Sequence, residues 1–326
     1  MTEPNSTPST TPTLLNASVI IPVYNGADTI RPLTERLEKT LPDLFADYEI
    51  LLIEDGGQDS SWTVIQELCQ QYEKVRGIRL MRNFGQHNAV LCGIREARYE
   101  ITITMDDDLQ HPPEQIGLLL AEYLKGYDVI YAVPKKLPHS WWRNISSKLS
   151  KFALSKIMRI PIQEIGAFRL FRTDLRKAFA DYRSPDVYID PLLSWGTAKF
   201  GHVMVDEEKR EIGHSNYTFS TLVRAGMLIL TGYSTVPLRL ASTIGFIFML
   251  FGFGILIYVL IITIALGSVP GFPFLSSIIA LFAGVQLFTL GIMGEYLARM
   301  YDRSTDRPPY IIGEDSRTAA RGPQEE

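Results

Sequence analysis

Residues 101–110 read ITITMDDDLQ, a short run rich in β-branched residues that ends directly in three aspartates. β-Branched residues favour strands, and a short apolar run bounded by polar residues is typical of a buried strand. The same order, an apolar run followed by polar side chains, occurs at residues 18–25, 49–57 and 77–83. These four stretches predict strands whose ends carry polar groups.

Longer amphipathic stretches separate the predicted strands. We expect strands at Ser18–Val23, Glu49–Glu54, Gly77–Met81, Ile101–Met105 and Asp128–Ala132, and helices at about residues 27–41, 59–73, 87–98 and 113–124. Strands that alternate with helices predict an α/β fold, with a mostly parallel sheet covered on both faces. Ligands of such sheets bind outside the carboxyl ends of the strands. The site is therefore expected where Tyr24, Asp55, Asn83 and Asp106 follow their strands.

Composition and missing motifs exclude several classes of protein. The net charge of −4 leaves no basic excess for binding nucleic acid. The two cysteines are too few for a disulfide scaffold. No G-x-G-x-x-G follows the first strand, and G-x-x-x-x-G-K-[ST] occurs nowhere in the chain. This disfavours dinucleotide oxidoreductases and P-loop NTPases.

The acidic segment after the fourth strand predicts a metal site. In extended backbone, residues i and i+2 point the same way, so three oxygen ligands would share one side and Asp107 would turn away. These ligands are Asp106, Asp108 and Gln110. Oxygen donors suit Mg²⁺ or Mn²⁺, which complete their coordination with water and substrate phosphates. A solvated acidic loop is the alternative, but the buried-looking strand and the nearby Asp55 favour the metal.

Two uncharged apolar runs near the C-terminus predict a membrane-spanning hairpin. Residues 243–266 and 272–294 each exceed the roughly 20 residues that cross about 30 Å of hydrocarbon. The alternative, two helices of a soluble core, would show a polar stripe that these runs lack. Arginines flank the hairpin but not its turn, at positions 224, 239, 299, 303 and 307. The positive-inside rule then places both termini and the α/β domain in the cytoplasm.

The rest of the chain forms one domain with short additions. Residues 1–16 are rich in Ser, Thr and Pro without an apolar signal segment, which predicts a disordered tail. The expected parts are a catalytic domain at 17–216 with a basic interfacial stretch at 135–159, an interfacial helix at 217–240, the hairpin at 241–296 and a cytosolic C-terminal tail at 297–326.

The stretch 135–159 combines basic and aromatic residues. It holds seven Lys or Arg and no Asp or Glu, with Trp141, Trp142 and Phe152 between them. This composition predicts an amphipathic segment at the membrane interface that attracts anionic lipid. Arg143 and Ser147, four residues apart, would share one helical face. A solvated basic helix with aromatic core contacts is the alternative.

Seven motifs together resemble family 2 glycosyltransferases of the GT-A fold. They are PVYN (22–25), EDGGQDS (54–60), RNFGQHNAV (82–90), DDDLQHPPE (106–114), GAFRLFR (166–172), R-x-x-G-x-S-x-Y (210–217) and GEYLARMY (294–301). With the hairpin, the chain is similar to polyprenyl-phosphate glycosyltransferases. These include dolichyl-phosphate mannose synthases and bacterial enzymes that load glucose or aminoarabinose onto undecaprenyl phosphate. The resemblance covers about residues 17–312.

The resemblance implies a metal-dependent inverting transfer of sugar from a nucleotide sugar, with UDP-sugar expected, to polyprenyl (undecaprenyl) phosphate at the inner membrane. It assigns donor binding to Pro22, Tyr24, Asn25, Glu54, Asp55, Asn83, Gln86 and Asp107. It assigns the acceptor phosphate to Lys135, Arg143, Ser147, Arg210, Ser215 and Tyr217. Catalysis is assigned to Asp106, Asp108 and Arg210, with Mg²⁺ or Mn²⁺ as cofactor. No nucleic-acid partner is expected, and a homo-oligomer stays open.

Four positions depart from the family pattern. Glu54 replaces Asp, Gly26 replaces a frequent Glu, Ala167 replaces Asp or a small polar residue, and Asn216 replaces Lys. The last three bear on the identity of the sugar more than on the reaction, because the metal ligands remain.

A catalytic base is not expected, since a phosphate monoester with a second pKa of about 6 is already anionic at neutral pH. Two alternatives stay open. A processive polysaccharide synthase usually has a Q-x-x-R-W segment, which this chain lacks. The other is a non-catalytic protein that binds nucleotide sugars or lipid.

Overall fold

The computed structural model describes residues 15–135, 166–206, 208, 235–266 and 271–319. Two compact units make up the chain. The first comprises residues 1–215 and 308–326, and the second comprises residues 216–307.

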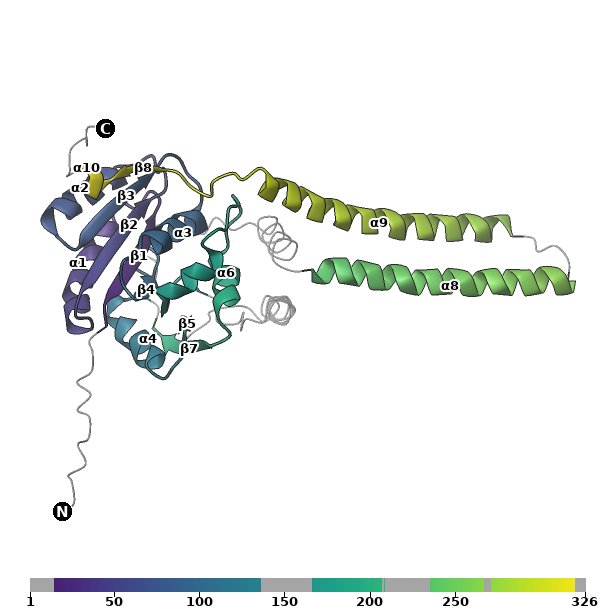
Figure 1. The fold of residues 1–326 in the computed structure, drawn as a ribbon, viewed down its shortest axis with the longest axis horizontal. Helices are drawn as coiled ribbons and strands as arrows, with labels where there is room; N and C mark the ends of the chain where they lie inside the picture. Colours follow the sequence, from purple (N-terminus) through teal and green to yellow (C-terminus); the bar gives the residue numbers. More distant parts are fainter. Residues whose placement is uncertain (1–14, 136–165, 207, 209–234, 267–270, 320–326) are drawn as a thin grey trace, which may run out of the picture. The chain divides into compact units, whose positions relative to one another are not determined.

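An eight-stranded mixed sheet is the centre of the first unit (Figure 1). Its strands are β1 (Ala17–Val23), β2 (Tyr48–Glu54), β3 (Val75–Leu80), β4 (Ile101–Thr104), β5 (Val129–Pro134), β6 (Arg169–Arg172), β7 (Phe200–Val205) and β8 (Ile312–Asp315). The sheet order is β7-β5-β6-β4-β1-β2-β3-β8. Strands β3, β2, β1 and β4 run parallel, whereas β6 is antiparallel to both its neighbours and β8 is antiparallel to β3. The predicted α/β class is confirmed.

Helices cover both faces of the sheet (Figure 1). They are α1 (Ile30–Thr40), α2 (Ser61–Gln71), α3 (Gln86–Glu96), α4 (Ile116–Tyr123) and α6 (Ile189–Gly196). Val19 and Ile21 of β1 join the core cluster that contains Leu33 of α1. On the other face Ile20 lies against Gly93 of α3, where a Cβ would come within 2.3 Å of Ile20 Cγ2. This covering explains why β1 is buried along its whole length, as continuous apolar strands of parallel sheets are.

Three strands of the sheet were not predicted. Strand β6 lies in the GAFRLFR motif and pairs with β4 and β5, and β7 pairs with β5. Strand β8 reads IGED, which carries no strand-like apolar pattern. It pairs with β3 and is followed by the short helix α10 (Ser316–Ala319). The expected cytosolic tail at 297–326 therefore contains an edge strand of the sheet.

The second unit consists of two long helices, α8 (Val236–Leu266) and α9 (Phe272–Ser304). Both predicted spans, 243–266 and 272–294, lie within them. Segments Val236–Val259 and Leu281–Ser304 are long and apolar enough to cross a membrane, and only 6% and 0% of their best windows are buried. Such exposure disfavours the alternative of two buried core helices.

The two helices pack against each other through small and aromatic residues. Phe248 and Phe282 meet edge to face with centroids 5.9 Å apart, and Gly252 lies against the Phe282 ring. Past the apolar part of α9, Arg299 pairs with Glu295 at 2.8 Å, as the spacing predicts. The predicted interfacial helix at 217–240 lies largely outside the described residues, and its last residues belong to α8.

Candidate active site

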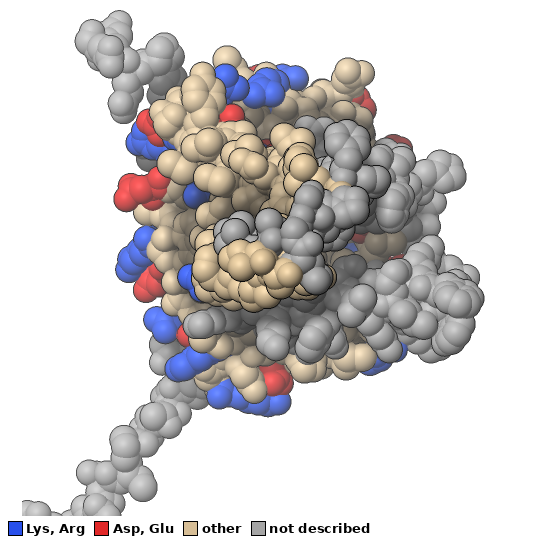
Figure 2. Space-filling model, turned by 90° about the vertical axis from the view of Figure 1, so that its right-hand side faces the viewer, with Lys and Arg blue, Asp and Glu red and all other residues tan. Residues whose placement is uncertain are grey.

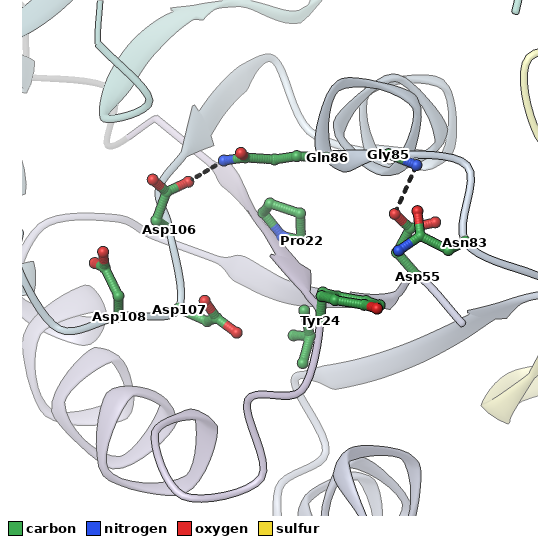
Figure 3. Close-up of a pocket in the computed structure, with 10 residues that line it drawn as sticks. Pro22, Tyr24, Asp55, Asn83, Gly85, Gln86, Asp106, Asp107 and Asp108 are labelled. Atoms are coloured by element: carbon green, nitrogen blue, oxygen red, sulfur yellow. Dashed lines mark hydrogen bonds between the residues drawn. The ribbon is translucent and has the colours of Figure 1, made fainter. Parts of the chain in front are cut away.

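A cavity of about 230 Å³ opens at the carboxyl ends of β1, β2 and β4 (Figure 3). Its lining consists of Pro22, Val23, Tyr24, Asp55, Asn83, Gly85, Gln86, Asp106, Asp107 and Asp108. Strand β1 lies between β2 and β4. The chain continues from β1 to β2 and β3 on one side of β1 and then crosses to β4 on the other side. Such a reversal of strand order opens a crevice between neighbouring loops, where α/β proteins bind ligands. The cavity lies at the strand ends where the sequence predicts a ligand site.

Three aspartates form one wall of the cavity. In Figure 3 the carboxylates of Asp106 and Asp108 point the same way, whereas Asp107 points toward Tyr24. Strand β4 ends at Thr104, the chain bends at residues 107–109, and Leu109 has a left-handed φ of 62°, so the segment is not the continuous extended chain assumed from the sequence. The expected common direction is seen for Asp106 and Asp108, whereas Gln110, the third predicted ligand, is not in the cavity lining.

Hydrogen bonds hold two carboxylates of the acidic wall, and the three carboxylates repel one another. Gln86 Nε2 donates to Asp106 Oδ1 at 2.5 Å, and the Gln110 amide donates to Asp108 Oδ1 at 3.1 Å. Burial, together with the charges of Asp106 and Asp108, raises the pKa of Asp107 to about 7. A cation at this wall would relieve the repulsion between the carboxylates.

Asp55 positions the loop between β3 and α3. Its Oδ1 accepts the Phe84 amide at 2.7 Å and its Oδ2 accepts the Gly85 amide at 2.8 Å. Burial raises the pKa of Asp55, and these two amides oppose the rise. Gly85 has φ 97°, a conformation that favours glycine, and it leads directly into Gln86. The carboxylate therefore fixes the loop that places Asn83 and Gln86 in the cavity.

Two predicted donor residues, Asn25 and Glu54, are not among the residues that line the cavity. Asn25 Oδ1 accepts the Gln58 amide at 2.8 Å. Glu54 is 1% exposed, accepts the Gly57 amide and pairs with Arg79 at 3.2 Å. Both side chains hold the loop after β2. Their predicted contact with the nucleoside stays a prediction.

The remaining predicted site residues are not in the described lining. Gln110 is outside it, and its backbone oxygen accepts the Glu208 amide at 2.9 Å. Lys135 pairs with Asp206 at 2.7 Å, beyond the ends of β5 and β7. Arg143, Ser147, Arg210, Ser215 and Tyr217 lie outside the described residues.

A buried ion pair supports the site and was not predicted. Arg169 of β6 is 3% exposed and pairs through Nη1 with Oδ1 of Asp190 on α6. Its Nε donates to Thr104 Oγ1 at 2.9 Å, two residues before the acidic wall. The Tyr131 hydroxyl donates to Asp190 at 3.0 Å. A charged residue inside each of the apolar runs AFRLF and YIDPLL is the signal that could have revealed this network.

The residues present fit a divalent metal with few protein ligands. Among the described residues, no three His, Cys, Asp or Glu side chains converge on one point as a complete metal cluster. Asp106 and Asp108 nevertheless present carboxylates to an open cavity. Mg²⁺ typically takes one or two carboxylates and completes its shell with water and substrate phosphates. The donor set therefore suits a metal that binds together with a phosphorylated ligand.

Comparison with known proteins places the chain among glycosyltransferases. Residues 18–179 match the family described as Glycosyl transferase family 2. The chain is 32% identical over 300 residues to undecaprenyl-phosphate 4-deoxy-4-formamido-L-arabinose transferase of Proteus mirabilis, covering 90% of this chain and 92% of that protein. It is 33% identical to the Pseudomonas aeruginosa protein of that name, covering 90% and 88%.

Solved structures show a more distant similarity. Glucosyl-3-phosphoglycerate synthase of Mycobacterium tuberculosis, in complex with Mn²⁺ and uridine-diphosphate-glucose, is 13% identical with a TM-score of 0.47, over 67% of this chain and 77% of that one. The sequence relatives decide the assignment, since they exceed 30% identity along almost their whole length. The chain belongs to glycosyltransferase family 2 and is a glycosyltransferase.

Proposed function

We propose that this glycosyltransferase moves a sugar from a nucleotide sugar, expected to be a UDP-sugar, to undecaprenyl phosphate. The cavity with its three aspartates at the end of β4 is the observation that carries the proposal. Relatives that share about a third of their residues with this chain are named for transfer of an arabinose derivative to undecaprenyl phosphate. The two apolar helices agree with a lipid acceptor.

The donor would bind with its nucleoside over Pro22 and Tyr24 and its diphosphate at the acidic wall. Tyr24 is 51% exposed and its ring faces the cavity, so it can cover a base without moving core residues (Figure 3). Asn83 and Gln86 offer amide groups from the loop that Asp55 holds. These groups would orient the sugar and phosphates by hydrogen bonds.

Asp106 and Asp108 would hold a divalent metal, either Mg²⁺ or Mn²⁺. When bound, such an ion supplies positive charge that offsets the charge of the departing nucleoside diphosphate. Gln86, which donates to Asp106, would keep that carboxylate turned toward the ion. Gln110 remains a proposed third ligand from the sequence pattern, although the structure does not include it in the cavity lining.

The reaction is a single displacement with inversion. An oxygen of the acceptor phosphate bonds to the anomeric carbon, and the bond from that carbon to the donor diphosphate breaks, with its electron pair leaving on the diphosphate. The attacking oxygen is already anionic near neutral pH, so no side chain needs to remove a proton. Cations must instead bring two anions together, and we assign this to Arg210, Arg143 and Lys135, with Ser147, Ser215 and Tyr217 as further phosphate ligands.

The acceptor would arrive from the membrane on the cytoplasmic side. On the face shown in Figure 2, described basic and acidic side chains lie interspersed along the edge rather than in a patch of one sign. Attraction to anionic lipid would come from the basic stretch 135–159, which has seven cations and no acidic residue. Arginines at both ends of the hairpin would place these ends on the cytoplasmic side of the inner membrane.

Transfer should require a phosphate on the lipid. Incubating the membrane-embedded protein with radiolabelled nucleotide sugars, Mg²⁺ or Mn²⁺ and undecaprenyl phosphate should yield labelled lipid with at least one donor. The neutral alcohol undecaprenol should give none, because its hydroxyl is not ionised and the site offers no assigned base. Equal transfer to both lipids would refute the mechanism without a base.

Arg143 should matter more for the acceptor than for the donor. Arg143→Ala removes a proposed cation for the lipid phosphate, so we expect the KM for undecaprenyl phosphate to rise about tenfold, as for a lost charged hydrogen bond. The Kd for the nucleotide, measured by titration, should stay within about twofold. Lys148→Ala, one residue from Ser147 in the same basic stretch, is the matched control. A variant with weakened nucleotide binding and an unchanged lipid KM would contradict this assignment.

A further inference from the structure

Arg79 of β3 connects the last strand of the sheet to the loop that carries Asp55. Its Nε lies 3.2 Å from Glu54 Oε2, and its Nη1 lies 3.2 Å from Glu314 Oε1 on β8. The guanidinium also lies 5.9 Å from the centroid of the Trp62 ring, and Trp62 Nε1 donates to Glu314 Oε2 at 3.2 Å. Arg79 is therefore held by groups from β2, β8 and α2.

Glu54 is the buried end of this chain of contacts. It is 1% exposed, and while one carboxylate oxygen pairs with Arg79, the other accepts the Gly57 amide. A buried carboxylate without a cation is costly, and Arg79 is the cation that pairs with Glu54.

The loop that Glu54 holds is packed against the cavity-lining residues. Gly56 has φ 64°, and a Cβ there would come within 2.3 Å of the Asn83 amide nitrogen. Asp55 comes directly before it, lines the cavity and holds the Phe84 amide. Because these backbones are in contact, a displaced Gly57 would also move Asp55 and Asn83.

The strand that carries Glu314 is fixed independently of Arg79. Arg76, three residues before Arg79 on β3, is 7% exposed and pairs with Asp315 at 2.6 Å. The Gly77 amide donates to Ser316 Oγ at 3.1 Å. In the ladder, Arg79 lies directly opposite Glu314, at cross-strand contact distance. These contacts hold the C-terminal strand, and with it Glu314, in place beside β3.

We propose that Arg79 is a positioning residue of the donor site and that Glu314 orients it, so that the C-terminal strand contributes to affinity for a nucleoside diphosphate. The effect passes from Glu314 through Arg79 and Glu54 to the loop at Gly57. None of these three side chains lines the cavity. The proposal rests on the proposed function, because the cavity beside this loop is taken to hold the donor nucleotide.

Binding and kinetics of Arg79 variants test the proposal on the full chain. Titration of UDP with Mn²⁺ present should show a Kd about fivefold higher for Arg79→Ala, with a matching rise in donor KM and kcat within about twofold. Arg79→Lys keeps a cation and should recover most of the affinity. Arg31→Ala breaks an exposed ion pair with Glu67. This control should leave the Kd for UDP and the donor KM unchanged. An unchanged Kd for Arg79→Ala, or a fall in kcat with donor KM unaltered, would overturn the positioning role.

A double-mutant cycle tests the part played by the C-terminal strand. Glu314→Gln should raise the Kd for UDP about two- to threefold in the wild-type background and have no further effect when Arg79 is alanine. Additive effects, or none in either background, would overturn the route through Arg79. A wild-type chain that binds neither UDP nor any other nucleoside diphosphate would instead refute the proposed function. The two failures are thus distinguishable.

Discussion

Replacing Asp108 with alanine is expected to abolish metal-dependent sugar transfer and to leave the chain folded. Asp108 lies partly exposed on the acidic wall of the cavity, and its carboxylate points the same way as that of Asp106. Removing it takes away one of two proposed carboxylate ligands of the metal. We expect kcat to fall by at least about 10²-fold, the effect of losing one group that stabilises developing charge. Labelled sugar transferred to undecaprenyl phosphate, with Mg²⁺ or Mn²⁺ titrated, measures this loss.

Asp174→Ala is the matched control for Asp108→Ala. Asp174 is exposed and pairs with Lys177 at 2.7 Å, so its loss removes a carboxylate of the same size away from the cavity. Both variants should keep the thermal midpoint of the wild type within a few degrees, since neither carboxylate packs in the core. Full activity of Asp108→Ala at every metal concentration would refute the assignment of the metal to this wall.

Arg169→Ala should give the largest loss of stability. The variant leaves the Asp190 carboxylate buried with the Tyr131 hydroxyl but without its guanidinium partner, and it removes the hydrogen bond to Thr104. Breaking a buried ion pair on one side destabilises proteins by about 3–5 kcal/mol, because an uncompensated charge remains inside. Urea unfolding of the detergent-solubilised chain, followed by circular dichroism of the catalytic unit, should show a lower midpoint.

Arg172→Ala on the same strand is the control for Arg169→Ala. Its side chain is 53% exposed and lies 3.7 Å from Asp128, so its ion pair is solvated. Exposed pairs contribute about 0–1 kcal/mol, and the unfolding midpoint should hardly change. If both variants have similar midpoints, the buried pair does not stabilise the sheet as argued. Arg169→Met, which restores volume without charge, should be no more stable than Arg169→Ala while Asp190 remains.

The strands and helices that line the site could be predicted because their residues are locally consistent. Apolar β-branched runs such as the one in β1 bury side chains on both faces of the sheet, which requires a layer of helices on each face. The strand positions and the α/β class therefore follow from the pattern of apolar residues. The polar residues after these runs meet at one sheet edge because parallel strands end there together. Tyr24, Asp55, Asn83 and Asp106 therefore line one cavity, as expected.

The supporting residues could not be predicted because their partners are far away in sequence. Glu54 and Asp55 are neighbours in the chain, yet Asp55 lines the cavity while Glu54 turns to Gly57 and Arg79. Adjacent residues of a strand point to opposite faces, and only the packing decides which face meets a ligand. Sequence pattern likewise gave no sign that Glu314 returns to β3, since pairing depends on a neighbour 235 positions away.

By itself the sequence determined the class of the fold, the two apolar spans and the acidic segment after the fourth strand. Each of these depends on local pattern, and the spans also depend on the lack of charged residues in the apolar runs. Tertiary structure alone decided three other features: the antiparallel entry of β6, the capture of β8 at the sheet edge and the burial of Arg169 with Asp190. These depend on backbone pairing and on buried charges finding partners, which link residues distant in the chain. Local sequence pattern does not identify such partners, because the paired residues come together only when the sheet forms.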